Sequence, residues 1–433
     1  MINILKELNI KELIKPTLIL IILLSYVSVF NQTRIVSPYS KYGLGDIEIY
    51  KFRSNSGIGY LHNAYSDAIT VNYLNPASYT GFDSASFVFE TAIISDFYRL
   101  QTTDLKQNGN YTSLGYLSFG FPLMKRWKAA LGLIPFSNMG YKLQENIWAD
   151  NIGNINYIYE GDGGVKQLYF GNAFKIGKNL SVGLNISYFF GSFERIQSIY
   201  FPDEDYNFAA KFTDRTTIND FHLNYGLQHR LKLSKKYSLM TGLSFALSDK
   251  INIKNSNFVE RLSKGINSYS AYDTLGVSEA VKTDFNLPLA IGFGFVLSNN
   301  NKWNAGLDID WQQWSEYKYA GRKDSLTDML QLAAGFEFTP DISSVSGYWQ
   351  KVKYRFGIRY AQSYLKFNTI QINEAGVSLG MVFPLKRSKT GLSVAIEAGQ
   401  RGTTDNNLIS EQYCRLTLAL SVYEKWFIKR KYE

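Results

Sequence analysis

The sequence predicts an all-β protein: a transmembrane antiparallel β-barrel of about fourteen strands with an N-terminal hatch inside the lumen. Three observations predict this fold class. Apolar and polar residues alternate with a period of two from about residue 84 to the C-terminus, as strands with two differently solvated faces require. The connectors between these segments are alternately long and short. About 47 residues without sustained periodicity, 37–83, precede the first segment, which is enough chain to fill a lumen.

The N-terminus carries the one strongly apolar helical stretch, residues 16–30, behind three lysines. It is shorter than the ~20 residues of a spanning helix and matches a signal-peptide core behind a basic segment. We therefore expect a signal peptide over 1–31, a hatch over 32–83 and the barrel over 84–433; a membrane anchor is the alternative for the first segment. No later stretch is long and apolar enough to span as a helix, so membrane integration must use strands.

The last predicted strand shows the alternation best. Leu416, Leu418 and Leu420 share one face, and Arg415 and Thr417 share the other. Segments of about 11–17 residues suit a tilted membrane span better than a soluble strand of ~5–6 residues. A propeller would repeat a motif every ~40–50 residues, and none recurs in this chain. The predicted strands lie near 84–97, 111–123, 127–137, 165–177, 179–195, 218–234, 236–252, 284–298, 302–316, 327–340, 352–366, 371–384, 390–402 and 409–423.

The connectors predict the orientation of the barrel. The turns between the predicted extracellular loops are mostly short and basic. The predicted extracellular loops are 98–110, 138–164, 196–217, 253–283, 317–326, 367–370 and 403–408. Long extracellular loops and short periplasmic turns are typical of outer-membrane barrels, so we expect the outer membrane of a Gram-negative bacterium and a periplasmic C-terminus. The turn 341–351 is an exception, because it should be short and is not. Basic turns explain much of the net charge of +9, so we expect no nucleic-acid partner.

The composition leaves little material for catalysis or metal binding. Cys414 is the single cysteine, and there are three histidines among 433 residues. A disulfide and a multi-Cys metal site are therefore excluded within the chain, and no Ser-His-Asp arrangement suggests itself. We expect no enzyme activity, no metal and no cofactor.

Short motifs along the chain resemble a known family. They are Ser37-Pro38-Tyr39-Ser40-Lys41-Tyr42-Gly43, Asn75-Pro76-Ala77, Pro135-Phe136-Ser137 with Gly140-Tyr141, Phe285-Asn286-Leu287-Pro288, Asp308-Ile309-Asp310-Trp311 with Trp314-Ser315-Glu316-Tyr317, and Tyr354-Arg355-Phe356-Gly357. On these motifs the chain resembles the FadL/TodX outer-membrane transporters of hydrophobic compounds. The resemblance spans nearly the whole mature chain. It implies a fourteen-stranded barrel, an N-terminal hatch and a long-chain fatty-acid-like cargo, although some relatives are partners of secretion or assembly machines.

The third predicted strand carries the candidate gate. Pro135 cannot donate a hydrogen bond to a neighbouring strand, and Gly140 follows shortly after, so the wall of the barrel is weakened there. In the family this kink gives a lateral exit into the bilayer. We hypothesise the same role for Pro135, Phe136, Gly140 and Tyr141; the alternative is that Pro135 only ends the strand at the rim. The candidate ligand-binding or gating residues are these four together with Asn75, Pro76 and Ala77 of the hatch.

Inward-facing charges form a second candidate site. Because unpaired charges in a confined lumen are costly, we expect them to pair with one another or to anchor the hatch. The alternative is that Arg355 or Arg359 binds the carboxylate of a cargo molecule with two hydrogen bonds. By strand parity these charges are Asp308, Asp310, Glu337, Lys353, Arg355, Arg359, Glu397, Arg401 and Arg415.

Two functions from different classes follow. The first is a passive channel that takes up hydrophobic small molecules past the hatch and through a lateral opening at the third strand. The second is a non-transporting barrel subunit of a secretion or outer-membrane assembly complex. Outer-membrane lipids are expected partners in both. A continuous apolar pocket between hatch and wall would favour the first, and a filled lumen the second.

Overall fold

The computed structural model describes residues 37–425 apart from short gaps at 49–50, 151, 203–207, 265–268, 279, 301, 320–321, 324–325, 346, 368 and 386–387. The predicted signal peptide, the first residues of the predicted hatch and the tail after residue 425 lie outside the described residues. No helix in the described part of the chain is long and apolar enough to cross a membrane.

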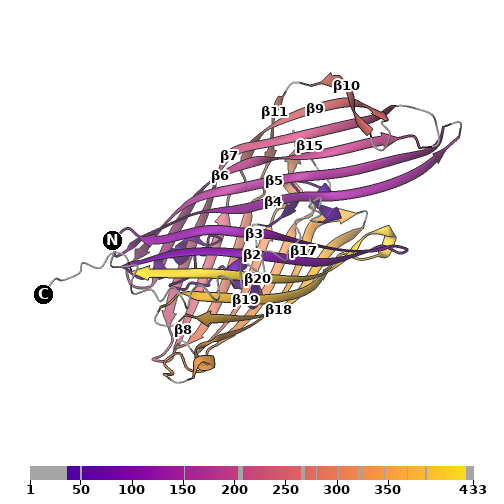
Figure 1. Cartoon of the computed structure of the whole chain (residues 1–433). Helices are drawn as coiled ribbons and strands as arrows, with labels where there is room; N and C mark the ends of the chain where they lie inside the picture. The colour runs from indigo at the N-terminus through magenta and orange to yellow at the C-terminus, as the bar shows by residue number, and fades with distance from the viewer. Residues whose placement is uncertain are drawn as a thin grey trace, which may run out of the picture. The chain divides into compact units, whose positions relative to one another are not determined.

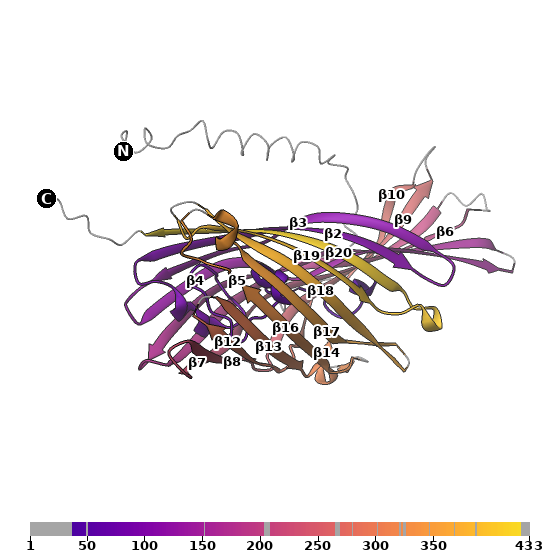
Figure 2. The same ribbon diagram turned by 90° about the horizontal axis from the view of Figure 1, so that it is seen from below.

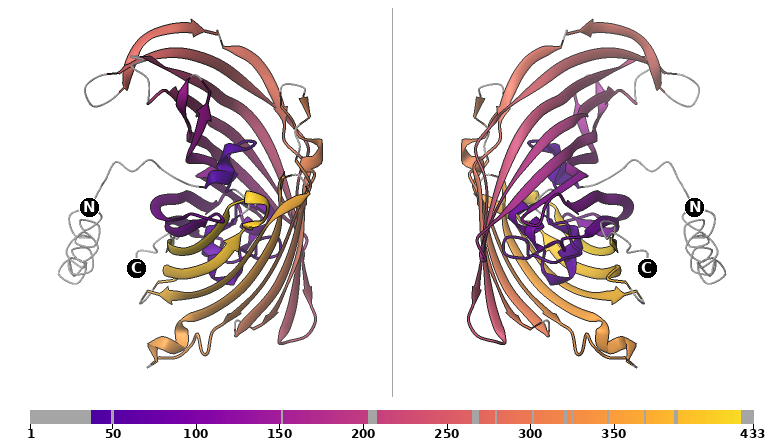
Figure 3. Two further views of the ribbon diagram at one scale, coloured as in Figure 1. Left: turned by 90° about the vertical axis from the view of Figure 1, so that its right-hand side faces the viewer. Right: turned by 90° about the vertical axis from the view of Figure 1, so that its left-hand side faces the viewer.

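The wall of the molecule is one antiparallel sheet that closes into a barrel of fourteen strands (Figures 1 and 3). The sheet closes where β2 pairs with β20. Ten of the strands in the described residues are continuous. These are β2 (Ser86–Gln101), β3 (Lys106–Pro122), β4 (Trp127–Ala149), β5 (Gly153–Ile176), β6 (Leu180–Tyr200), β7 (Phe208–Lys232), β17 (Lys353–Phe367), β18 (Ile370–Pro384), β19 (Gly391–Arg401) and β20 (Ser410–Lys425).

The other four barrel strands are interrupted by short breaks. One combines β8 (Tyr237–Ala246) with β9 (Lys250–Lys264), and the next combines β10 (Tyr269–Val277), β11 (Val281–Asn286) and β12 (Ala290–Asn299). The remaining two combine β13 (Trp303–Gln312) with β14 (Lys318–Tyr319), and β15 (Arg322–Lys323) with β16 (Met329–Phe338). Every predicted segment overlaps one of the fourteen strands, so the predicted fold class is confirmed.

The two faces of the wall differ as the alternation predicts. On β20, Arg415 and Thr417 point into the lumen and are buried, whereas Cys414 and Leu418 point outward and are exposed. Phe170 on β5 and Ile396 on β19 are likewise outward and exposed. A closed barrel with an apolar outer band is the arrangement that satisfies every backbone polar group in lipid.

Three of the predicted long loops are wrong. The segments 138–164, 196–217 and 253–283 are mostly strand, because β4 to β7 and β9 to β11 project beyond the other strands at one end of the barrel (Figure 1). Neighbouring side chains there are exposed on both faces, as at Gln144 and Glu145, so the regular apolar alternation stops while the backbone pairing continues. Lys142 on β4 and Glu160 on β5 pair across these projections at 2.7 Å.

The N-terminal segment 37–83 lies inside the lumen (Figures 2 and 3). It contains four short elements: the 3-10 helices η1 (Pro38–Lys41), η2 (Arg53–Ile58) and η3 (Pro76–Gly81), and the two-residue strand β1 (Asp46–Ile47). Asn55, Phe52 and Asn75 are fully buried. We call segment 37–83 the hatch.

Leu418 tests which face of β20 meets lipid. Replacing Leu418 with Arg is expected to lower the free energy of unfolding by ~2–4 kcal/mol, the cost of a cation on the lipid face near the bilayer midplane. The control is Leu105→Arg in the turn between β2 and β3, where Leu105 is 73% exposed. Urea titration of the barrel refolded into phospholipid vesicles measures both. Equal effects of the two substitutions would contradict the assigned faces.

Candidate functional site

The Asn-Pro-Ala motif fastens the hatch to the wall. Asn75 caps η3 by accepting a hydrogen bond from the backbone N–H of Ala77 at 3.1 Å. Its side-chain amide donates to the carbonyl of Asn63 at 2.6 Å and to the wall carbonyls of Leu227 and Leu243, both at 3.3 Å. The motif therefore ties the hatch to itself and to β7 and β8.

Glycines on the lumen face of the wall make room for the hatch backbone. A Cβ at Gly357 would overlap the backbone nitrogen of Gly59, and one at Gly242 would overlap the carbonyl of Asn63. The wall glycines in such contact with hatch backbone or with the Asn-Pro-Ala motif are Gly183, Gly226, Gly242, Gly335, Gly357 and Gly380. Gly335 and Gly357 are cross-strand neighbours, as are Gly183 and Gly226. We call these six residues the glycine seat.

Asp308 and Asp310 bind the hatch at His62 and Asn63. Asp308 accepts hydrogen bonds from the backbone N–H groups of His62 and Asn63 at 2.7 and 2.9 Å. Asp310 accepts from the Asn63 side-chain amide at 2.9 Å and lies 3.2 Å from Nε2 of His62. Burial alone lowers the pKa of the His62 imidazole, but Asp310 and Asp308 outweigh burial and raise that pKa to about 9. A cationic His62 thus offsets part of the buried negative charge.

Arg355 connects the wall to the hatch. Its guanidinium donates to Glu337 at 2.7 Å, to the backbone carbonyl of Ser54 at 3.0 Å and to the hydroxyl of Tyr65 at 3.1 Å. Both charged side chains are about 4% exposed, and removing one partner of such a buried pair costs ~3–5 kcal/mol. Nearby, Lys353 holds Asp67 of the hatch at 3.0 Å.

Arg359, Glu397 and Arg415 form a second buried network. Arg359 lies 2.5 Å from Glu374 and 2.9 Å from Glu397, and Arg415 lies 3.2 Å from Glu397. Tyr60 of the hatch donates a short hydrogen bond to Glu397. The guanidinium of Arg359 therefore meets carboxylates of the protein itself, and Tyr60 joins this network to the hatch.

The candidate gate on β4 lies at a break in strand pairing. Pairing with β5 skips Phe136, passing from Pro135 opposite Lys166 to Ser137 opposite Val165. On its other side β4 pairs with β3 only as far as Leu133. Beyond that point the two strands diverge (Figure 1). Pro135 does not end the strand, because β4 continues to Ala149.

The hatch takes the place of β3 along this part of β4. β1 pairs with β4, with Asp46 opposite Asn138 and Ile47 opposite Ser137. Ser37 donates its backbone N–H to the carbonyl of Gly140 at 3.2 Å, and Ser40 Oγ accepts from the N–H of Gly140 at 3.1 Å. Phe136 and Tyr141 are buried. The hatch thus covers the edge of β4 that β3 leaves.

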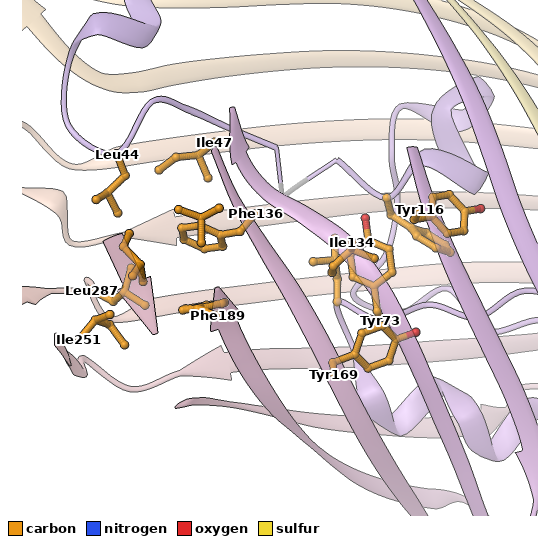
Figure 4. Close-up of a cluster of buried hydrophobic side chains, with 14 of the residues drawn as sticks. Leu44, Ile47, Tyr73, Tyr116, Ile134, Phe136, Tyr169, Phe189, Ile251 and Leu287 are labelled. Atoms are coloured by element: carbon orange, nitrogen blue, oxygen red, sulfur yellow. The ribbon is translucent and has the colours of Figure 1, made fainter. Parts of the chain in front are cut away.

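Apolar side chains fill the lumen between the hatch and this part of the wall (Figure 4). Leu44 and Ile47 of the hatch face the cluster that contains Phe136 and Phe189. The rings of these two phenylalanines are 4.6 Å apart between centroids. A hollow beside Phe136 measures about 50 Å³, whereas an engineered cavity that binds benzene measures ~150 Å³. A hollow of that size has room for a water or two but is too small for a hydrocarbon.

Several partners of the predicted charges were missing from the sequence prediction. Asp96 and Glu374 lie on lumen faces, and the same parity rule would have found them if it had been applied to every strand. His62, Ser54 and Tyr60 come from the hatch, whose sequence has no periodicity from which to read a direction. The alternation places glycines such as Gly357 on the lumen face, but they carry no charge and were therefore not among the predicted site residues.

A protein-family model with the description BamG matches residues 13–433, which is nearly the whole chain. No curated protein matches.

Several solved structures are similar in fold. The toluene transporter TodX of Pseudomonas putida has a TM-score of 0.57 at 14% identity, covering 89% of this chain and 100% of its own. The toluene transporter TbuX of Ralstonia pickettii has a TM-score of 0.56 at 11% identity, covering 85% and 97%. The monoaromatic hydrocarbon channel CymD has a TM-score of 0.54 at 12% identity, covering 90% and 99%. The resemblance to the FadL/TodX family is confirmed for the fold, while the family model that matches is not FadL.

Gly357 tests whether the glycine seat holds the hatch. Gly357→Ala is expected to lower the free energy of unfolding by ~1–3 kcal/mol, because the added methyl group overpacks a backbone contact. The control is Gly276→Ala on β10, where an added Cβ meets nothing within 4 Å. Urea unfolding in detergent compares the two. A Gly357→Ala protein as stable as the control would show that the hatch does not rest on this glycine.

Proposed function

The chain belongs to the BamG family, and from this membership and from the filled part of the lumen beside the candidate gate we propose that it is a sealed outer-membrane β-barrel that serves as a non-transporting subunit of an outer-membrane protein assembly. The observation that carries the proposal is the seating of the hatch. Its backbone rests in the glycine seat, its polar groups are bound by buried wall charges, and the hollow beside Phe136 is smaller than any hydrocarbon cargo.

The proposed orientation places the short turns in the periplasm. The turns after β3, β5, β7 and β12 contain three or four residues, and β20 ends on the same side of the barrel. Some connectors at the other end are as short, with three residues after β4 and two after β17, but at that end β4 to β7 and β9 to β11 project beyond the wall (Figure 1). Short periplasmic turns and longer extracellular segments are the rule for outer-membrane barrels. The C-terminus is then periplasmic, and the projecting parts of β4 to β7 and β9 to β11 are extracellular.

The projecting strands offer surface to partner proteins. Trp148 and Ile147 at the end of β4 are 67% and 42% exposed, and Tyr272 and Leu275 on β10 are 62% and 58% exposed. These apolar side chains lie on strands that extend past the rest of the wall. Apolar side chains exposed beyond the rest of the wall are available to a partner protein, which supports a role in an assembly.

A second candidate function is passive uptake of hydrophobic small molecules, such as fatty-acid-like compounds. The observation that favours it is the divergence of β3 from β4 beside the bulge at Phe136. In this candidate the cargo would leave sideways into the bilayer between these strands. The hatch would first have to release β4, breaking the pairs that Asp46 and Ile47 make with Asn138 and Ser137.

Purification from native membranes separates the two candidates. The tagged chain is extracted in a mild detergent, and its bound proteins and extractable lipids are quantified against those of an unrelated tagged barrel from the same membranes. We expect partner proteins in fixed stoichiometry and no stoichiometric small molecule. A monomer that carries one apolar molecule per chain would refute the subunit proposal and support uptake.

A further inference from the structure

The barrel contains a large hollow at its short-turn end, beneath the hatch. Its volume is about 1020 Å³, at the upper end of the ~300–1,000 Å³ typical of ligand pockets. Hatch residues 64–69 form its inner limit, and residues of β7, β8, β12, β13 and β16 to β20 form its sides. We call this hollow the vestibule. The vestibule is separate from the glycine seat and from the filled part of the lumen around Phe136.

The vestibule is apolar inside and positively charged at its rim. Of its three acidic residues, Asp67 and Glu337 are bound by Lys353, at 3.0 and 3.8 Å, and Glu424 is exposed next to Lys425. Five cationic residues against these three acidic ones leave the lining with a formal net charge of +2. The apolar lining includes Ile69, Met240, Val296 and Val382, and the cationic lining includes Arg230, Lys351, Lys389 and Lys425. Lys389 is paired with Asp83 at 2.7 Å. The rim therefore attracts negatively charged groups while the interior accepts apolar ones.

The long turn 339–352 extends this surface beyond the hollow. Ile342 and Tyr348 line the vestibule and are still 54% and 40% exposed, and Val345 near the tip is 99% exposed. The turn is ordered by backbone and side-chain bonds, such as that from the N–H of Asp341 to the carbonyl of Gln350 at 2.8 Å. Exposed apolar side chains beside a hollow offer surface to a macromolecule, since a small ligand in the hollow would not cover Val345.

The charge of this end restricts the occupant. Neighbouring turns add exposed cations, among them Lys125, Arg126, Lys178 and Lys235. The chain's own tail carries Lys429, Arg430 and Lys431, so it would be repelled, and two copies of the chain would repel each other in the same way. Charge complementarity favours an acidic partner.

We propose that the vestibule and the turn 339–352 together dock an acidic segment with apolar side chains from another protein on the short-turn side of the membrane. This inference rests on the proposed function and identifies one of the surfaces by which the subunit joins its assembly. The apolar side chains of the partner enter between Met240 and Val382, and its carboxylates meet Lys351 and Arg230 at the rim.

Photo-crosslinking in intact cells tests the docking. The photoreactive residue p-benzoylphenylalanine replaces Tyr348 in the vestibule or, as a control, Tyr237 at the neighbouring turn after β7. Each probe is combined with the double charge reversal Arg230→Glu/Lys351→Glu or with the matched control Lys178→Glu, a reversal in a turn outside the vestibule. Folding of every variant is checked by its heat-dependent shift on a gel, and cross-linked peptides are sequenced by mass spectrometry.

We expect the probe at position 348 to cross-link one other protein within a segment of net negative charge. The double reversal should reduce the yield about fivefold or more, because rim charges steer encounter and fix register, and Lys178→Glu should leave it unchanged. Cross-links to lipid only, to this chain itself or to a basic segment would overturn the inference, as would a yield insensitive to the double reversal. If partners still co-purify while the vestibule fails these tests, the docking site is wrong and the subunit function stands.

Discussion

The close approach of hatch backbone to wall backbone at the glycine seat is the contact on which the rest of the structure depends. Without Cβ atoms at Gly357, Gly335 and Gly242, the hatch lies near enough to the wall for its N–H and carbonyl groups to reach wall partners. This close approach also brings Ser54 within hydrogen-bond distance of Arg355 and places His62 beside Asp310. Buried charges are stable only with such partners, so the seat and the ion pairs depend on each other.

The fold was predictable because alternation with a period of two is a local property of each strand. The same rule assigns Arg355, Glu397 and Arg415 to the lumen face. It failed for the ends of the projecting strands, where both faces of the strand are exposed and apolar residues no longer alternate regularly with polar ones. It could not give the position of the hatch, whose direction is set by wall residues hundreds of positions away, such as Asp308 for His62. The divergence of β3 from β4 also depends on the hatch, because β1 supplies the pairing that β3 gives up.

This molecule combines the fold of hydrocarbon channels with a hatch that fills the lumen beside β4. The kinked strand β4 and the departure of β3 provide the geometry of a side opening, and the hatch then occupies it. As a proposed subunit, the barrel uses its closed interior as a rigid support. In this proposal, partners bind at its two ends: at the projecting strands on one side and at the vestibule with its basic rim on the other. The large hollow lies beneath the hatch, where it is open to macromolecules without breaching the seal.

Whether the hatch is a fixed part of the barrel is tested most directly by hydrogen–deuterium exchange of the chain in native-like lipid discs. If it is fixed, amides of hatch segments 53–63 and 71–79 exchange as slowly as those of β17 and β18, because they open only when the wall does. Exchange of the hatch within seconds, while the wall strands stay protected, would show that the hatch moves independently. That result would contradict the sealed barrel and favour uptake.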